Sequence, residues 1–267
     1  KGDAIGKRPI DRTLKGLESL GVAIDTVGDN IIFTNSKGMG GGAYSFDKNT
    51  HTGTEAMILA TVLGTGTVVL NNCAEEPEVD NLVAVLSDMG AKIVRTNKRT
   101  IEVTGQKTLL KGAVGVSMYD RLEAVTMLVL SILTGGEVVV ENVVRKDIES
   151  FANMLEGIGV KLKWSENSVA VKEIKTPLRA TTIETAIHPG FMSDWQSVTT
   201  LLLAVLGDGE SVIVEKIFPG RFGVLEELKV MGLKYELFKP KNLKPEDCNF
   251  NTDEFGTNLH GAKVTGP

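Results

Sequence analysis

Apolar residues recur at helical spacing in four segments of the chain, and each segment ends near a glycine. The segments read RTLKGLESLGVAI, DNLVAVLSDMGAKI, IESFANMLEGIGVKL and RFGVLEELKVMGLKY. Their glycines lie at intervals of 69, 69 and 73 residues, at Gly21, Gly90, Gly159 and Gly232. Because a glycine in this place is typical of a left-handed C-cap, the pattern predicts four amphipathic helices that bury one face and stop there.

Three further segments are apolar on nearly all sides: TGTEAMILATVLGTG, DRLEAVTMLVLSILTGG and SDWQSVTTLLLAVLGDG. A helix without a polar face is normally buried, so these segments predict core helices. Each begins with two residues at capping-box spacing, in which the side chains satisfy backbone N–H groups at the start of the helix. The pairs are Thr52 with Glu55, Asp120 with Glu123, and Ser193 with Gln196.

Each core segment runs through glycines into a β-branched stretch, and the three stretches are TVVLNN, EVVVEN and ESVIVEK. Two more strand-like runs follow the amphipathic segments, as in KIVRTNKRTIEV and KLKWSENSVAV. The repeating order is core helix, strand, amphipathic helix, strand, strand, and the third copy degenerates in KPKNLKPEDCNFNTDEFG. This repeat of about seventy residues predicts an α/β architecture of repeated lobes with helices buried among sheets.

The glycine-rich stretch KGMGGGAYSF at residues 37–46 does not favour a dinucleotide site. It contains a G-x-G-x-x-A pattern, but a Phe-Asp-Lys stretch follows where the dinucleotide fingerprint requires a helix. We therefore expect a flexible turn between strands.

Composition narrows the class of protein. The 267 residues are enough for two domains, and 42% hydrophobic against 24% charged residues suits a chain with a real core. No apolar run is long enough to cross a bilayer. A net charge of −5 argues against duplex nucleic acid as a partner. Cys73 and Cys248 are too few for a disulfide framework, which fits a reducing cytoplasm.

The sequence also bears on metal binding and on whether the chain is part of a longer protein. The three histidines share no metal-ligand spacing, so we expect no metal site. The chain starts with Lys1 and shows no signal peptide, and we expect it to be a segment of something longer.

Some stretches carry groups that the other copies of the repeat lack. HPGFMSDWQS contains Asp194, and the first eleven residues crowd Asp3, Arg8 and Asp11 into a Gly- and Pro-rich loop. Loops on a rigid scaffold often hold binding groups. The plainer alternatives are that Asp194 is an acid in a first helical turn, stabilised by the helix dipole, and that the loop is a solvated charged surface. The acidic stretch CAEEPEVD favours an ordinary first turn.

Six stretches together resemble UDP-N-acetylglucosamine enolpyruvyl transferases over nearly the whole chain. In order, they are GDAIGKRPID, FDKNTHTGTE, NNCAEEPEVDNLVAVLSDMGAKI, YDRLEA, HPGFMSDWQS and IFPGRFGVLEELKVMG. The resemblance implies two lobes, each an inside-out α/β barrel of three repeats. Residues 1–115 are then expected to form the later part of the first lobe, and residues 116–267 most of the second. It also implies a cytoplasmic enzyme at the start of peptidoglycan synthesis.

The implied reaction transfers the enolpyruvyl group of phosphoenolpyruvate to the 3′-hydroxyl of UDP-N-acetylglucosamine and releases phosphate. It implies no cofactor, metal, membrane or nucleic-acid partner. Asp3 stands where many members have a cysteine that donates the proton and is alkylated by fosfomycin. Asp194 matches the carboxylate beside the sugar hydroxyl, and Arg8 matches an arginine that contacts phosphoenolpyruvate and the sugar nucleotide.

The resemblance also assigns two strips and one backbone contact to UDP-N-acetylglucosamine. These positions are Arg8, Pro9, Ile10, Asp11 and Arg12, then Lys48, Asn49, Thr50 and His51, and finally Ile217. Several residues depart from the family pattern: Glu75 replaces a common arginine, Pro219 and Gly220 replace an acidic-Asn pair, and Asn49 and His51 replace apolar residues.

Two other functions stay open at this stage. The related 3-phosphoshikimate 1-carboxyvinyltransferase shares the fold and the phosphoenolpyruvate chemistry, although the RPID and HPGF-x-x-D stretches favour the UDP-sugar enzyme. A catalytically silent or truncated protein that only binds UDP-sugar would show substituted contacts such as those above. The family's amino-terminal Lys-Asn pair and carboxy-terminal arginine have no counterpart, so we expect this chain alone not to turn over efficiently.

Overall fold

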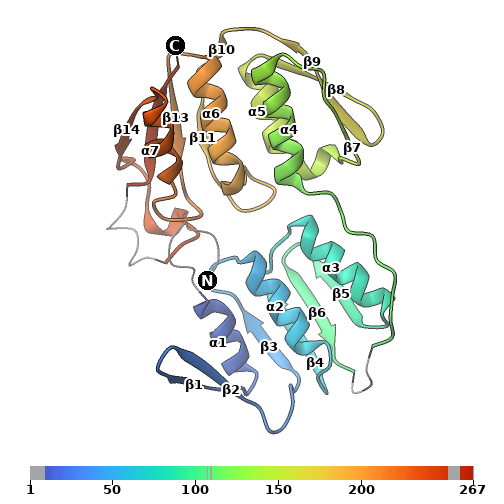
Figure 1. The fold of residues 1–267 in the computed structure, drawn as a ribbon. Coiled ribbons are helices and arrows are strands. Elements are labelled where there is room, and N and C mark those ends of the chain that lie inside the picture. Colours follow the sequence, from blue (N-terminus) through green and yellow to red (C-terminus); the bar gives the residue numbers. More distant parts are fainter. Residues whose placement is uncertain (1–9, 107, 109, 252–258, 267) are drawn as a thin grey trace. The chain divides into compact units, whose positions relative to one another are not determined.

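The chain forms two compact units, divided between Met118 and Tyr119 (Figure 1). The computed structural model describes residues 10–106, 108, 110–251 and 259–266. We call the described residues up to Met118 the N-terminal unit and those from Tyr119 the C-terminal unit.

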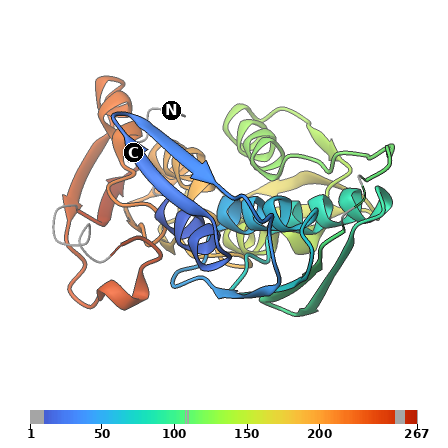
Figure 2. The same ribbon diagram turned by 90° about the horizontal axis from the view of Figure 1, so that it is seen from below.

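The N-terminal unit places two helices on one face of a four-stranded sheet of order β3-β4-β6-β5, as Figure 2 shows for α2 and α3. Strands β3 and β4 are parallel and the other pairs are antiparallel, while β1 and β2 form a separate hairpin. Its elements are α1 (Asp11–Ser19), β1 (Ala23–Val27), β2 (Asn30–Thr34), β3 (Gly42–Ser45), α2 (His51–Thr61), β4 (Thr67–Asn71), α3 (Pro77–Asp88), β5 (Lys92–Asn97) and β6 (Thr100–Thr104).

The C-terminal unit contains two further copies of the same arrangement, with sheets of order β7-β9-β8 and β11-β13-β15-β14 and a short parallel pair β10-β12. The elements of the first copy are α4 (Arg121–Thr134), β7 (Val139–Glu141), η1 (Arg145–Ile148), α5 (Glu149–Ile158), β8 (Val160–Trp164) and β9 (Ser168–Ile174). Those that follow are β10 (Leu178–Arg179), β11 (Thr182–Glu184), η2 (Ser193–Trp195), α6 (Gln196–Leu206), β12 (Gly207–Asp208), β13 (Glu210–Val214), α7 (Gly223–Val230), β14 (Lys234–Phe238), η3 (Pro245–Asp247) and β15 (Gly261–Thr265).

The predicted order of helix, strand, helix, strand, strand is confirmed in all three copies. The third copy does not degenerate, because β14 and β15 pair antiparallel as its last two strands. The sequence hid this because residues 239–260 separate the two strands, where the other copies have a short turn.

The core helices lie where their composition predicts. In the C-terminal unit α4 and α6 contact each other, and Leu128 and Leu202 are fully buried between the sheets. In the N-terminal unit Met57 and Ile58 of α2 are fully buried. Burial is not complete on every side, however, since Leu130 of α4 remains 47% exposed.

The four glycines at the helix ends are confirmed as left-handed, although only Gly159 is itself the C-cap and the other three directly follow it. All adopt left-handed backbone angles, with φ of +89° at Gly21, +102° at Gly90, +116° at Gly159 and +103° at Gly232. A side chain rarely adopts these angles, which explains why the repeat carries glycine at the end of each amphipathic helix.

The predicted N-caps are partly wrong. The Asp120 carboxylate accepts hydrogen bonds from the N–H groups of Leu122 and Glu123, as predicted. Helix α2 begins two residues earlier than expected, so Thr50 rather than Thr52 is its N-cap and accepts from the Gly53 N–H at 3.2 Å.

The glycine-rich stretch follows β2 and itself contains β3 (Gly42–Ser45), so it leads into a strand and lacks the helix of a dinucleotide site. In the described ranges, no helix is both long and apolar enough to span a membrane. Cys73 and Cys248 are both buried free thiols.

Candidate functional site

The predicted site residues that the structure describes fall into two clusters, one in each unit. Asp3, Arg8 and Pro9 lie outside the described residues. The clusters are therefore built separately, from the elements that carry them.

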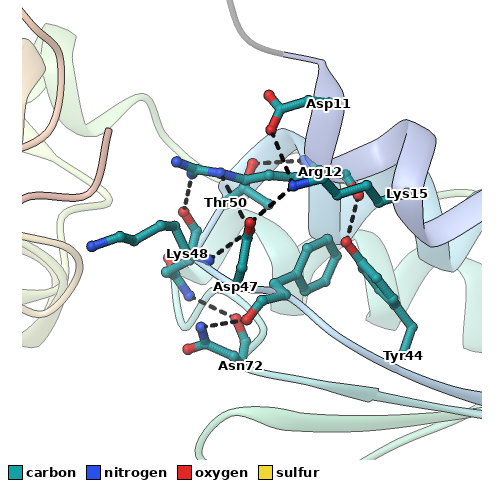
Figure 3. A network of polar contacts seen from close by, with 11 residues as sticks. Asp11, Arg12, Lys15, Tyr44, Asp47, Lys48, Thr50 and Asn72 are labelled. Carbon is teal, nitrogen blue, oxygen red and sulfur yellow. Dashed lines mark hydrogen bonds and ion pairs between the residues drawn. The ribbon is translucent and has the colours of Figure 1, made fainter. Parts of the chain in front are cut away.

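The N-terminal cluster joins the two strips that were predicted separately. Ile10 precedes α1 and is 52% exposed, whereas Arg12 in the first turn of α1 is buried. The Arg12 Nη1 donates a hydrogen bond of 2.8 Å to the carbonyl oxygen of Asn49 (Figure 3). Residues 37 positions apart in the chain thus become neighbours.

Asp47 organises this cluster, although it was not predicted as a site residue. Its carboxylate lies 3.2 Å from Lys15 Nζ and 3.9 Å from Arg12 Nε, and it accepts a hydrogen bond from the Lys48 N–H. Burial opposes ionisation of Asp47, but the bonds from Lys48 and Lys15 lower its pKa overall. Lys15 also lies 3.9 Å from Asp11. The side chain of Lys48 extends away from these contacts (Figure 3).

The neighbours of Lys48 have local structural roles. Asn49 is buried and donates from Nδ2 to the carbonyl oxygen of Asn72, and Asn72 donates in turn to the carbonyl oxygen of Phe46. Thr50 caps α2. The polar residue at position 49, which departs from the family pattern, therefore ties the end of β4 to the start of α2.

His51 begins α2, and its Nε2 lies 3.3 Å from Glu55 Oε1. Burial alone would lower the pKa of His51, but the hydrogen bond and charge of Glu55, with the charges of Glu76 and Glu78, raise it above the usual 6.5. Protonated His51 then stabilises the fold below the unfolded pKa, and this contribution is lost as the pH rises through the folded value.

Replacing Glu55 with glutamine is expected to lower the pKa of His51, because the main group that favours the imidazolium loses its charge. An NMR titration of the His51 ring in wild type and in Glu55→Gln measures this. Glu18→Gln, at an exposed position of α1, is the control. An identical His51 titration in Glu55→Gln and wild type would contradict the assignment.

The C-terminal cluster is built around Asp194, which lies in the short 3₁₀ helix η2 before α6. Its side chain is 44% exposed and its Oδ1 accepts a hydrogen bond of 2.7 Å from Arg221 Nη2. The predicted capping box is wrong here. The Ser193 hydroxyl is buried, donates to Glu215 Oε2 at 3.0 Å and accepts from Arg221 Nη1 at 3.1 Å, so its oxygen pairs with this guanidinium and not with a backbone N–H.

Glu215, at the end of β13, is fully buried. Burial raises the pKa of Glu215, while hydrogen bonds from the N–H groups of Phe218 and Ile217 and the hydroxyls of Thr185 and Ser193 oppose that rise. Ile217 uses its backbone N–H in this way. Since the N–H of Ile217 is bonded to Glu215, the backbone contact to a nucleotide that the resemblance predicts would be made by the Ile217 carbonyl oxygen.

The HPGF stretch before Asp194 is held by the core. Arg121 is buried, lies 3.3 Å from His188 Nδ1 through its Nη1, and stacks over the ring of Trp195. The rings of Phe191 and Trp195 pack edge to face with centroids 5.5 Å apart. The turn that carries Asp194 is thus anchored from both sides.

In the C-terminal cluster, Arg221 and Glu215 are the residues that sequence reasoning missed, as it missed Asp47 in the N-terminal cluster. Glu215 follows the β-branched run ESVIV, where a charged residue at the end of a buried strand is a usable signal. Arg221 gives no local signal. The C-terminal cluster thus presents a partly exposed carboxylate beside a guanidinium, a pair that can accept a proton and bind an anionic group.

Comparison with known proteins gives consistent matches along the chain. A family model described as EPSP synthase (3-phosphoshikimate 1-carboxyvinyltransferase) matches residues 2–265. The chain is 39% identical over 231 residues to the UDP-N-acetylglucosamine 1-carboxyvinyltransferase of Sorangium cellulosum, which covers 86% of this chain and 54% of that protein. It is 38% identical over 236 residues to UDP-N-acetylglucosamine 1-carboxyvinyltransferase 1 of Caldanaerobacter subterraneus, with 88% and 56% covered. The chain spans about half the length of these curated relatives.

Solved structures share the fold. The enolpyruvyl transferase NikO from Streptomyces tendae aligns with a TM-score of 0.78 at 20% identity, covering 97% of this chain and 59% of that one. An EPSP synthase from Acinetobacter baumannii aligns with a TM-score of 0.62 at 19% identity, covering 100% and 58%. At this identity the likeness shows the fold alone, and it confirms the predicted α/β class.

Proposed function

The chain belongs to the enolpyruvyl transferase family described by the EPSP synthase model, and from this we propose that the protein transfers the enolpyruvyl group of phosphoenolpyruvate to the 3′-hydroxyl of UDP-N-acetylglucosamine. The observation that carries the proposal is Asp194, whose carboxylate is partly exposed and not engaged in capping. The curated relatives with that name support the choice of substrate.

In the proposed reaction Asp194 accepts the proton of the attacking sugar hydroxyl. A general base must be within hydrogen-bond reach of that proton, so its side chain must be both held and accessible. The ion pair with Arg221 holds Asp194, and its 44% exposure leaves it accessible. The Ile217 carbonyl contacts the nucleotide.

The N-terminal cluster supplies the remaining described contacts to UDP-N-acetylglucosamine, namely Ile10, Asp11, Arg12, Lys48, Asn49, Thr50 and His51. Within this set the ammonium group of Lys48 binds the diphosphate, because a lysine matches the family pattern at this position and its charge complements that of a diphosphate. Asn49 and Thr50 act chiefly by shaping the backbone, since their side chains are bonded within the unit.

Three assignments rest on the sequence alone. Asp3 donates the proton to the methylene carbon, and Arg8 and Pro9 contact the substrates. We further assign residues 1–115 to the later part of one lobe and residues 116–267 to most of the other. The proposed setting is the cytoplasm, and the proposed chemistry uses no cofactor or metal.

A phosphate-release assay on the full-length gene product tests the function. We expect phosphate only when phosphoenolpyruvate and UDP-N-acetylglucosamine are both present. Release with 3-phosphoshikimate instead would identify the rival enzyme of the same family. Binding of UDP-N-acetylglucosamine without release would identify a silent binding protein.

Lys48→Ala is expected to weaken UDP-N-acetylglucosamine binding roughly tenfold or more, because a charged hydrogen bond to a diphosphate contributes about 1.5–3 kcal/mol. Calorimetry on the full-length gene product measures the change. The matched control is Lys98→Ala, at an exposed position between β5 and β6. Equal affinity of wild type and Lys48→Ala would remove Lys48 from the site.

A further inference from the structure

We infer that Glu215 is a positioning residue, whose buried carboxylate fixes the nucleotide-contacting turn at Ile217 and the Asp194 side chain in one arrangement. The inference rests on the proposed function, which gives Ile217 and Asp194 their roles. Glu215 itself is fully buried and touches no substrate. One of its carboxylate oxygens accepts hydrogen bonds from the turn at Ile217, and the other accepts a hydrogen bond from Ser193, next to Asp194.

One carboxylate oxygen holds the turn after β13. Oε1 accepts from the N–H of Ile217 at 2.8 Å, the N–H of Phe218 at 2.9 Å and the hydroxyl of Thr185 at 2.8 Å. The Thr185 hydroxyl also accepts from the N–H of Lys216 at 2.8 Å. Three successive backbone N–H groups are therefore fixed by Glu215 directly or through Thr185.

The other oxygen reaches the catalytic carboxylate through two side chains. Oε2 accepts from the Ser193 hydroxyl, and that hydroxyl accepts from Arg221 Nη1 at 3.1 Å. Arg221 donates from its second nitrogen, Nη2, to Asp194. Since a guanidinium is planar and rigid, fixing one nitrogen on Ser193 fixes the direction from which the other meets Asp194.

The other two copies of the repeat hold the equivalent turn without a carboxylate. The Cys73 N–H donates to the carbonyl oxygen of Arg99 at 3.0 Å, and the Val143 N–H donates to that of Asn167 at 3.1 Å. In the third copy the Glu215 N–H makes the same contact, to the carbonyl oxygen of His260 at 2.8 Å, and the Glu215 side chain adds its bonds from the N–H groups of Ile217 and Phe218. The bonds to the Glu215 carboxylate are therefore additional to a backbone contact that all three copies share.

Glu215 is also unusual as a buried carboxylate at this place. The residues that make the same backbone contact in the other copies are Cys73 and Val143, which are buried as well but carry no carboxylate. Two of the four donors to Glu215 are backbone N–H groups, which can only donate, so the site is built for an acceptor. A buried carboxylate is costly unless fully hydrogen-bonded, and among the described residues it occurs at this place only in the copy that carries Asp194.

Three variants separate the two halves of this network in the phosphate-release assay. Glu215→Gln retains one carbonyl oxygen but cannot accept from Ser193, and we expect kcat to fall roughly tenfold or more with a raised KM for UDP-N-acetylglucosamine. Ser193→Ala removes only the link toward Asp194, so kcat should fall while KM stays unchanged. Thr185→Val loosens only the turn, so KM should rise more than kcat falls.

The matched control is Ser131→Ala. Ser131 is also a buried serine of the C-terminal unit, and its hydroxyl donates to the Gly136 carbonyl oxygen at 2.7 Å, at the far end of α4. A purely structural role for Glu215 and Ser193 would make their variants behave like this control, with a lowered Tm and wild-type kcat and KM. Such a result, in an active wild type, overturns the inference and leaves the proposed function standing.

An inactive wild type would instead contradict the proposed function. Amide hydrogen exchange then tests whether Glu215 still holds the turn at Ile217 and the residues around Asp194. Faster exchange at Ile217, Phe218 and residues 193–195 in Glu215→Gln supports the inference, and unchanged exchange overturns it. If Glu215→Gln does not fold, Ser193→Ala and Thr185→Val carry the same kinetic test, and equal effects of both on kcat and KM overturn the inference.

Discussion

Asp194→Asn is expected to lower turnover by about two orders of magnitude or more while leaving the fold intact. The amide retains the shape of the carboxylate and an oxygen for the bond from Arg221. It is far too weak a base to accept the proton of the sugar hydroxyl. Because the ion pair is partly exposed, its loss is expected to change the free energy of unfolding by at most about 1 kcal/mol.

The two interpretations of Asp194, as a general base and as an acid in a first helical turn, predict different results for this variant. Phosphate release measures turnover and thermal unfolding measures stability, both on the full-length gene product. Glu156→Gln is the control, since Glu156 is 40% exposed and paired with Arg145 at 3.3 Å in the same unit. It should show a similar small stability change and normal turnover. Near-normal turnover in Asp194→Asn would reduce Asp194 to a structural partner of Arg221.

The architecture was predictable because local patterns in the sequence determine where its helices and strands begin and end. Glycine is the residue that tolerates φ near +100°, so Gly90 and Gly232 mark helix ends without any knowledge of tertiary contacts. The apolar surface of α4 and α6 likewise requires burial wherever the helices sit. A repeat of such signals specifies the order of elements, which the structure confirms in all three copies.

Details at helix starts were less predictable because side chains there have competing partners. Thr50 and Thr52 are both suitable N-caps, and spacing alone favoured the wrong one. At Ser193 the local rule failed for a different reason, since the hydroxyl oxygen accepts from Arg221, which is 28 residues away in sequence. A capping box describes only what neighbouring residues offer, so it fails where a distant ionised group competes.

The candidate site was predicted only in part for the same reason. Resemblance to a family assigned Asp194 and Arg12 to the site, but neither periodicity nor spacing indicates that Arg12 bonds to the backbone of Asn49. Arg221 acquires its role solely by lying 2.7 Å from Asp194. Contacts between residues far apart in the chain depend on how the elements pack, which local patterns do not record.

The second large effect is expected at Asp3, where the resemblance predicts a proton donor in place of the family's usual cysteine. Asp3→Asn should lower turnover about a hundredfold or more, because an amide cannot donate a proton to the methylene carbon. Wild type should resist fosfomycin. The epoxide of fosfomycin is opened by a thiolate, which is a far stronger nucleophile than a carboxyl group.

Asp3→Cys should therefore remain active and gain time-dependent inactivation by fosfomycin, with a covalent adduct at residue 3 that mass spectrometry locates. Cys73 and Cys248 serve as internal controls, because both are buried and burial raises the pKa of Cys73 to about 11, so neither should be alkylated. Rapid inactivation of wild type with an adduct elsewhere, or full activity of Asp3→Asn, would show that another group donates the proton. Asp3→Cys thus tests whether residue 3 faces the substrate. A substrate-sized epoxide should alkylate a thiol in that position and leave the buried thiols of Cys73 and Cys248 unmodified.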